Sequence, residues 1–146
     1  MEELRTLKDI KGYANDELDT ISQIAYFMMM QGKNRESKIL FEALVAIEPS
    51  NEYYYRALGV IAQKQDDSDL AIKHFGYSIK LAPTLPHAYV NRAEIFISLG
   101  RQEEAEKDLQ EALARIRRED QALSQKAWAL YRNLKFSEPT HNFETV

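Results

Sequence analysis

The feature of this chain that most constrains its fold is a pattern of apolar and small residues that returns at a spacing of 34. The pattern fills the stretch from Glu52 to Leu85 and recurs on both sides of it. The recurring sets are Ile21, Tyr55 and Tyr89; Ala25, Gly59 and Ala93; Ser37, Ala71 and Ala105; Phe41, Phe75 and Leu109; and Pro49 and Pro83. A fixed period of this length is typical of stacked helical hairpins, in which each unit buries its apolar face against its neighbours.

Each period also has the order of residues that a helical hairpin needs. A large residue is followed four positions later by a small one, and then by a turn, a small residue and an aromatic or leucine residue. Gly32, Asp66 and Gly100 stand at the matching turns, where tolerance of positive φ lets the chain reverse. This order resembles the tetratricopeptide (TPR) repeat. It implies an all-α, right-handed superhelix of three helix-turn-helix repeats, flanked by N-terminal and C-terminal capping helices.

The register predicts the organisation of the chain. Residues 1-14 are expected to form an N-terminal helix, and 15-117 to hold three repeats, placed by register at 18-51, 52-85 and 86-119. A C-terminal capping helix is expected at 118-135, followed by a flexible tail at 136-146. The first hairpin is predicted over Glu17 to Gln31 and Arg35 to Ile47, with Asn15 or Asp16 as its N-terminal cap. Arg117 stands where a third proline would fall, so the second helix of the third repeat is free to continue.

The two ends of the chain show their own apolar rows. Leu4, Leu7 and Ile10 predict an amphipathic helix over Glu2 to Lys11, which either caps the first repeat or forms a homodimer through this helix. Near the other end, one helix face is expected to cover the last repeat. That face holds Ala122, Ala127, Leu130, Tyr131 and Leu134, with Leu123 and Trp128 beside it.

Composition excludes several classes of function. The net charge of −4 argues against a nucleic-acid partner, which needs clustered cations. The stretch from Arg115 to Lys135 has six basic and two acidic residues, and we interpret it as a solvated helix face rather than a surface for an acidic partner. Without cysteine there are no disulfides. The N-terminus has no signal-peptide core, and the apolar run from Ile24 to Met30 is too short for membrane insertion, so a cytoplasmic protein is expected.

No constellation of residues predicts catalysis, a cofactor or a metal site. His74, His87 and His141 fall on different predicted elements, and no acidic residue stands at metal-ligand spacing from them. The phosphate-binding, zinc-hydrolase and nucleophile-elbow motifs are all missing from the sequence. We therefore expect a protein-binding module rather than an enzyme.

Position in the repeat predicts which side chains line the inner side of the stack, where solenoids hold partner segments. The second, fifth, ninth, twelfth and thirteenth residues of each repeat share one stripe of its first helix, away from the packed stripe at the fourth, seventh, eighth and eleventh. The candidate groove residues are Ser22, Tyr26, Met29, Met30, Tyr53, Arg56, Val60, Gln63, Lys64, His87, Val90, Glu94 and Ile97. Tyr55 falls on the packed stripe and leaves Tyr53 for the groove. The stripe predicts a cleft for apolar anchors of a protein or peptide, and the alternative for its methionines is packing against the N-terminal helix.

Three pairs of segments carry a closer resemblance. They are IAYFMMMQGK with ILFEALVAIEP, YYYRALGVIAQK with DLAIKHFGYSIKLAP, and RAEIFISLG with RQEEAEKDLQEAL. From Asn15 to Ala114 the chain resembles the class II chaperones of bacterial type III secretion systems, small three-repeat TPR proteins that hold translocator subunits before export. In that family tyrosines line the first-repeat groove; Tyr26 matches one of them, whereas Ser22 and Met29 replace others.

The resemblance implies a non-catalytic cytoplasmic chaperone whose concave groove holds an apolar segment of a secreted, translocator-like protein. The alternative is a bacterial TPR adaptor that scaffolds a signalling, motility or envelope complex. A clamp for the acidic tails of heat-shock proteins is not expected. Its ninth positions would carry Tyr26, Val60 and Glu94, and the stripe offers only Arg56 and Lys64 as cations.

Overall fold

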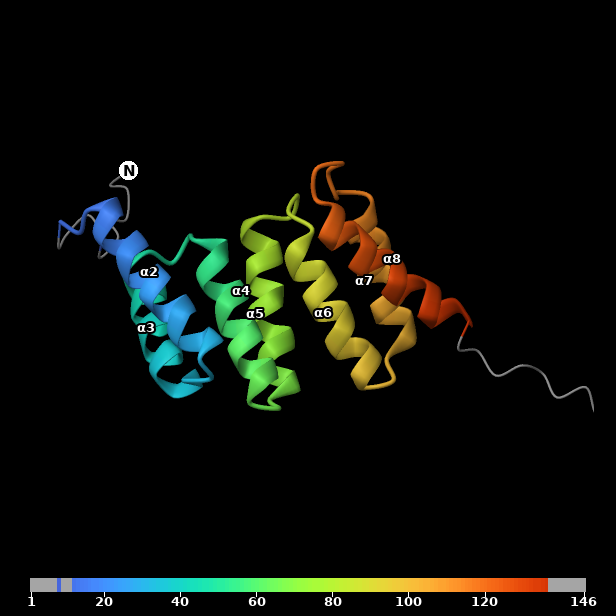
Figure 1. Ribbon diagram of the computed structural model, residues 1–146, viewed down its shortest axis with the longest axis horizontal. Coiled ribbons are helices and arrows are strands. Elements are labelled where there is room, and N and C mark those ends of the chain that lie inside the picture. The colour runs from blue at the N-terminus through green and yellow to red at the C-terminus, as the bar shows by residue number, and fades with distance from the viewer. Residues whose placement is uncertain (1–7, 9–11, 137–146) are drawn as a thin grey trace, which may run out of the picture.

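The protein is described by a computed structural model that covers Lys8 and residues 12–136 of the chain. These residues form α-helices and turns, without a strand. The helices are α2 (Asn15–Met30), α3 (Asn34–Ile47), α4 (Glu52–Lys64), α5 (Ser68–Leu81), α6 (His87–Ser98), α7 (Gln102–Leu113) and α8 (Gln121–Phe136). Three helix pairs stand side by side along the long axis, with α8 after the third pair (Figure 1). The all-α TPR superhelix is confirmed, and the predicted helix over Glu2 to Lys11 and the predicted tail lie, apart from Lys8 and Phe136, outside the described residues.

The first helices of the pairs lie on the inner side of the stack. Contacts join α2 to α4, α4 to α6 and α6 to α8, whereas in the described part of the chain none joins α3 to α5 or α5 to α7. Neighbouring first helices are therefore closer together than neighbouring second helices. A stack with this difference curves toward its first helices, which makes α2, α4, α6 and α8 the inner helices and α3, α5 and α7 the outer helices.

The turns inside the three pairs repeat one geometry. Gly32, Asp66 and Gly100 have φ values of 77°, 58° and 71°. After each of them, the next backbone N–H reaches back to a carbonyl in the last turn of the inner helix; the bond from Asp67 to Ala62, for example, is 2.9 Å long. Glycine takes this left-handed conformation without strain, and aspartate tolerates it better than most residues. The three turn positions that the sequence predicted are therefore equivalent in space.

Capping side chains begin two of the helices. The Asn51 side chain accepts a hydrogen bond from the backbone N–H of Tyr53, and Asp67 accepts one from Leu70. The prediction for α2 was wrong, because Asn15 and Asp16 both lie inside the helix. The Glu17 carboxylate instead accepts a hydrogen bond from the Ala14 N–H at 3.1 Å and fixes the first turn around Ala14.

The end of α7 also differs from the expectation that this helix could continue past Arg117. It ends at Leu113 although no proline follows it. Arg115 ends it instead, because its guanidinium donates to the Glu111 carbonyl and, at 2.8 Å, to the carbonyl of Pro83 in the loop before α6. A cation that binds the last carbonyls of a helix stabilises a stop at that point.

Apolar residues of the described helices form three core clusters. Partly buried side chains shared between neighbouring clusters, such as Val60 and Ile72, join them into one core. The first joins α2, α3 and α4, the second joins α4, α5 and α6, and the third joins α6, α7 and α8. On α8, Ala127 and Leu134 are buried, and Leu123, Leu130 and Tyr131 pack beside them. Ala122 is exposed, contrary to prediction, because the row of α8 that faces the core begins at Leu123 and returns at steps of three and four residues.

Polar contacts inside this core tie inner helices to outer ones. The buried Ser37 hydroxyl donates to the Ala25 carbonyl at 2.7 Å and joins α3 to α2. Arg92 on α6 makes a bidentate ion pair with the buried Asp108 on α7, in which Nε donates to Oδ2 at 2.7 Å and Nη2 donates to Oδ1 at 2.8 Å. Because these groups are satisfied where they are buried, they fix the relative position of the helices in each pair.

Helices α4 and α5 approach each other very closely at Gly59. A Cβ added to Gly59 would lie 2.6 Å from the nearest ring carbon of Phe75, closer than real Cβ contacts allow. Gly59 is therefore the place where the Phe75 ring lies directly on the backbone of α4. Gly76, also inside a helix, has room, because an added Cβ would meet only the Arg92 guanidinium at 3.7 Å.

We predict that Gly59→Leu destabilises the protein by about 1–3 kcal/mol, since the ring of Phe75 must move away from α4. Gly76→Ala serves as the control and should stabilise it by about 0.5–1 kcal/mol, because alanine is the better helix residue and fits without displacement. Chemical denaturation of both variants measures these changes. A Gly59→Leu variant as stable as the wild type would show that the α4–α5 packing is wrong.

Candidate functional site

The structure places most of the predicted groove residues at the surface of the inner helices. Eleven of them are exposed or partly exposed: Ser22, Tyr26, Met30, Tyr53, Arg56, Val60, Gln63, Lys64, His87, Glu94 and Ile97. The exposure of these side chains varies along the stack. The α2 end is the most open, with Tyr26 46% and Met30 61% exposed, whereas Val60 and Ile97 lie partly within the core clusters.

Two of the predicted groove residues are buried, and their assignment to the groove is wrong. Met29 is 5% exposed and packs in the core between α2, α3 and α4. Val90 is fully buried, because α6 has neighbours on every side: α4, α5, α7 and α8 all contact it. A helix in the middle of the stack buries a wider stripe than a helix at its end, so a fixed set of repeat positions overestimates the groove at α6.

The three consecutive tyrosines are also arranged differently from the prediction. Tyr54, which was assigned to neither stripe, is the buried one, with 2% of its surface exposed. Burial, together with the neighbouring Glu48 carboxylate, raises the pKa of Tyr54 to about 12. Tyr55 is only partly buried and packs against Tyr77 of α5, with ring centroids 5.4 Å apart. Tyr53 reaches the groove as predicted.

A depression of about 320 Å³ lies where α2 faces the start of α4. Its lining consists of Asp19, Ser22, Gln23, Tyr26 and Tyr53. Two phenol rings, one carboxylate, one hydroxyl and one amide therefore share this depression, and Tyr26 is its most exposed aromatic residue. Gln23 was missed because it lies at the sixth position of the repeat, next to the predicted stripe.

Contacts with neighbouring side chains fix the orientation of the Tyr53 ring. It meets the Phe41 ring of α3 edge-on, with centroids 6.0 Å apart and an interplanar angle of 77°. The Arg56 guanidinium lies 5.3 Å from the centre of the same ring. Burial raises the pKa of Tyr53, so its hydroxyl stays protonated and available as a hydrogen-bond donor. The ring is therefore a preorganised wall of the depression.

The Arg56 guanidinium in the central groove is already occupied. Arg56 binds both oxygens of Glu52 at 3.2 and 3.3 Å, and Glu52 also accepts a hydrogen bond from the buried Ser78 hydroxyl. Further along, Glu94 of α6 pairs with Lys126 of α8 at 2.9 Å. A paired guanidinium has few donors left for a ligand, so Arg56 offers little to an incoming carboxylate.

The pKa is lowered at two histidines, His87 of the groove and His74 of the outer helix α5. Burial lowers the pKa of His87, and the positive charge of Arg56 lowers it further. Burial also lowers the pKa of His74, again with help from a neighbouring cation, Lys73. Both imidazoles are therefore neutral near pH 7, and protonation of either one opposes folding.

The described residues contain no group of three or more histidine, aspartate or glutamate side chains placed to hold a metal ion. Among the same residues, no helix is both long enough and apolar enough to cross a membrane.

Comparisons with known proteins agree with this helical-repeat fold. The family model named tetratricopeptide repeat matches residues 86–118, which contain α6 and α7. A search of the curated proteins found no match to the sequence. Among solved structures, the type III secretion translocator chaperone SycD of Yersinia enterocolitica is 23% identical, with a TM-score of 0.85 over 89% of this chain and 98% of that chain. The chain has the fold of SycD.

Two related complexes share this fold. SycD bound to a peptide of the translocator YopD is 24% identical, with a TM-score of 0.79 over 84% of this chain and 95% of that chain. PcrH, a protein of Pseudomonas aeruginosa, bound to the chaperone-binding region of PopD is 21% identical, with a TM-score of 0.80 over 86% of this chain and 96% of that chain. Both alignments include nearly the whole length of the solved chains and most of this chain. The likeness therefore includes the inner helices and is not limited to one repeat.

We predict that the stability of the protein falls as the pH drops below about 6.5, the ordinary pKa of histidine. In that range the unfolded chain binds protons at His74 and His87 that the folded chain resists, so the free energy of unfolding decreases from there downward. Urea denaturation at about pH 7.5 and about pH 5.5 measures the difference.

The control for this pH effect is the double variant His74→Gln with His87→Gln, which retains all the carboxylates. Its stability should change less between the two pH values than that of the wild type. An equal pH dependence in both proteins would contradict the assignment to these two histidines.

Proposed function

We propose that this protein is a non-catalytic, cytoplasmic chaperone that holds an extended, apolar segment of a secreted, translocator-like protein in its inner groove. The observation that carries the proposal is the open aromatic depression between α2 and α4, with Tyr26 on its edge and Tyr53 on its wall. The shared fold with SycD and PcrH supports it, because those proteins are known in complexes with translocator segments.

The chemistry of the groove favours apolar anchors. Tyr26 and Met30 stand one helical turn apart on α2, and both are largely exposed. Aromatic rings give a large contact area at a small entropic cost, and methionine adapts to irregular surfaces. Since Arg56 is already held by Glu52, the central groove supplies shape and apolar surface rather than charge. An extended segment that places two or three apolar residues along the inner helices satisfies these conditions.

We predict that Tyr26→Ala and Tyr53→Ala each reduce partner affinity by about 1–3 kcal/mol, a loss of roughly fivefold to a hundredfold. Tyr26→Ala removes exposed surface and should leave the fold intact. Tyr53 also packs on Phe41, so Tyr53→Phe keeps the ring and tests its hydroxyl alone. The partner is first recovered by affinity capture from the native cytosol and identified by mass spectrometry, and its affinity for each variant is then measured by titration.

The matched control is Ile39→Ala on the outer helix α3. Ile39 is 65% exposed, so its replacement removes a similar apolar surface outside the groove. The proposal requires Ile39→Ala to bind like the wild type. Equal losses in the inner and outer variants would show that the groove is not the binding site, and a soluble regulatory protein as the recovered partner would favour the adaptor function instead.

The outer end of the first pair suggests a role for the N-terminal segment. Ile24 and Phe27 on α2 are 46% and 62% exposed on the side of the helix that has no preceding repeat. Lys8 pairs with Glu48 at the end of α3 at 2.9 Å, so this residue of the N-terminal segment lies against the first pair. We propose that its apolar row covers these side chains, as a cap does in other solenoids. A homodimer through the same row is the alternative.

We predict that Leu7→Glu with Ile10→Glu, made in the full chain, lowers the stability of the protein without changing its sedimentation as a monomer. The physical reason is that the two glutamates cannot cover an apolar end without being desolvated. Sedimentation velocity and a thermal melt measure the two properties. If the wild type sediments as a dimer and the variant as a monomer, the homodimer replaces the cap.

A further inference from the structure

The last helix repeats the sequence of the first groove helix. Gln121, Ser124, Gln125 and Trp128 of α8 stand three repeat periods after Asp19, Ser22, Gln23 and Tyr26 of α2. Both helices therefore carry serine, glutamine and an aromatic residue at the same spacing. Ala127 is fully buried and takes the place of Ala25, Gly59 and Ala93, so α8 is a fourth inner helix and not only a cap.

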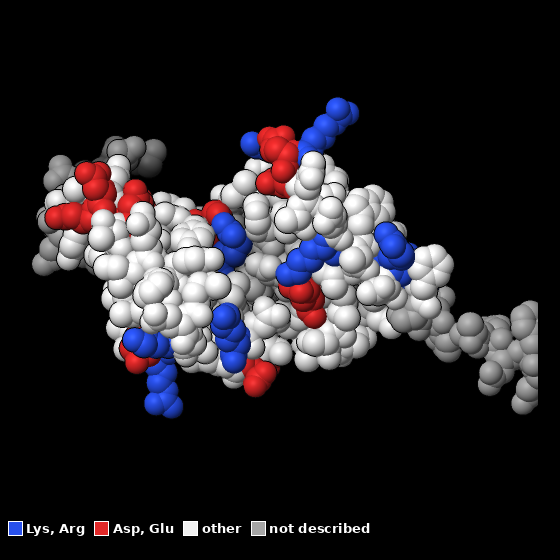
Figure 2. Space-filling view, in the orientation of Figure 1, with Lys and Arg blue, Asp and Glu red and all other residues white. Residues whose placement is uncertain are grey.

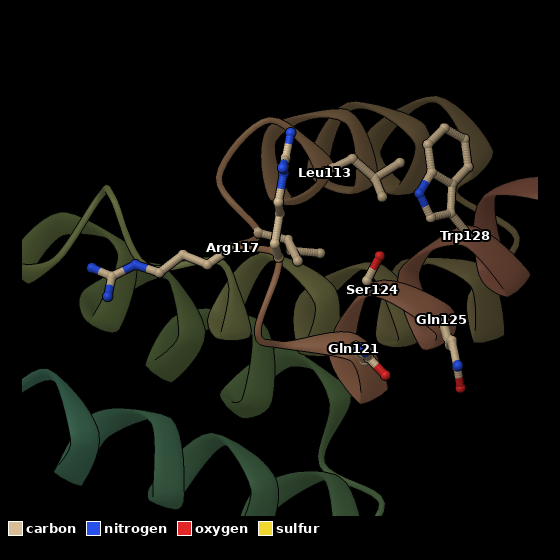
Figure 3. Close-up of a pocket in the computed structure, with 8 residues that line it drawn as sticks. Leu113, Arg117, Gln121, Ser124, Gln125 and Trp128 are labelled. Carbon is tan, nitrogen blue, oxygen red and sulfur yellow. The ribbon is translucent and has the colours of Figure 1, made fainter.

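A second depression lies against these residues, at the corner where α7 turns into α8. Its volume is about 280 Å³, and its lining adds Leu113, Ile116, Arg117 and Arg118 to the four side chains of α8. Leu113 of α7 and Trp128 of α8 point toward one another across it, with Ser124 between them (Figure 3). Trp128 is 52% exposed, and the ring of Tyr131 supports it edge-on at 6.0 Å. The depression thus has one aromatic and one aliphatic wall.

Arg117 and Arg118 at this depression differ from Arg56 and Arg92 of the inner helices α4 and α6, and from Arg101 and Arg115 beside α7. Arg56, Arg92, Arg101 and Arg115 are all paired with carboxylates. Arg117 and Arg118 are exposed and have no ion pair within the described residues. Glu119 and Asp120 belong to the same loop, where Figure 2 shows acidic and basic side chains together, but neither lines the depression. The Arg117 side chain extends away from Leu113 and Trp128 in Figure 3, so a carboxylate would meet it at the rim of the depression and not between these two walls.

The two ends of the inner side therefore differ in charge. The depression between α2 and α4 contains the carboxylate of Asp19, and acidic side chains gather over the start of α2 in Figure 2. At the equivalent position α8 has the neutral Gln121, with Arg117 and Arg118 beside it. Guanidinium groups bind carboxylates through two parallel hydrogen bonds, and tryptophan is a strong anchor for apolar and aromatic groups.

We propose that the α8 depression is a second anchoring site for the segment that the protein holds, and that it binds an acidic residue next to a large apolar or aromatic one. The proposal rests on the proposed function, because one segment would lie along the inner side from α2 to α8. Its acidic end would lie at Arg117 and Arg118, and the opposite charge at Asp19 would disfavour the reverse direction. The basic stretch near the C-terminus then has a binding role in addition to solvation.

The test uses a phage library of random peptides of about 15 residues, which span roughly 50 Å when extended. Peptides selected on the wild type should be enriched in aspartate or glutamate next to an apolar residue. Selection on Arg117→Glu with Arg118→Glu should lose this enrichment. The control Arg35→Glu with Lys73→Glu changes the net charge equally on the outer helices and should keep it. Equal enrichment on all three proteins overturns the proposal.

Direct contact is read from the fluorescence of Trp128, the single tryptophan of the chain. Binding of a selected peptide should shift its emission to shorter wavelength, and Trp128→Ala should lower the affinity of the labelled peptide about tenfold, with partial rescue in Trp128→Phe. A peptide that needs Tyr26 but leaves the Trp128 emission unchanged overturns this inference and spares the proposed function.

The remaining outcomes separate the two proposals further. Peptides whose binding is unaffected by both Tyr26→Ala and Trp128→Ala contradict the groove itself, and therefore the proposed function. A wild-type dimer that Trp128→Ala converts to a monomer would show that a second copy of the chain covers the depression, which also overturns the inference.

Discussion

The close contact between each inner helix and its outer partner, made at one small residue, is the constraint on which the rest of the structure depends. At Gly59 the Phe75 ring lies on the helix backbone itself, and Ala25, Ala93 and Ala127 take the equivalent place in the other inner helices without exposed surface. This approach sets how closely the two helices of a pair pack. Because the inner helices then contact each other while the outer helices do not, the stack curves, and the curvature creates the groove.

Much of this fold could be predicted from the sequence because its signals are local or periodic. Gly32, Asp66 and Gly100 determine the turns through their tolerance of positive φ, and Asn51 and Asp67 cap helices through contacts within three residues. The end of α7 could not be predicted in this way. Arg115 ends that helix by binding the carbonyl of Pro83, a partner far away in the sequence that only the tertiary structure brings near.

The groove was predicted less completely, since exposure depends on neighbours and not on register alone. The same register position holds the partly exposed Arg56, which pairs with Glu52, and the fully buried Val90, although α4 and α6 each contact four other helices. Tyr54 shows the same effect, because its burial follows from the exact rotation of α4 against α3. The pattern of α8 was present in the sequence as a fourth recurrence, at Ser124, Gln125 and Trp128, but the prediction treated this segment only as a cap.

The position of the two depressions connects the fold to what the groove can recognise. In the middle of the stack, neighbours on both sides bury apolar side chains and pair the charges, so little is left for a ligand. At the ends, α2 and α8 lack one of those neighbours, and each keeps an aromatic side chain exposed, Tyr26 or Trp128. The inner side therefore keeps an aromatic side chain exposed near each end of the described stack, beside two depressions whose linings differ in charge. That difference, Asp19 against Arg117 and Arg118, is what would give a bound segment its direction.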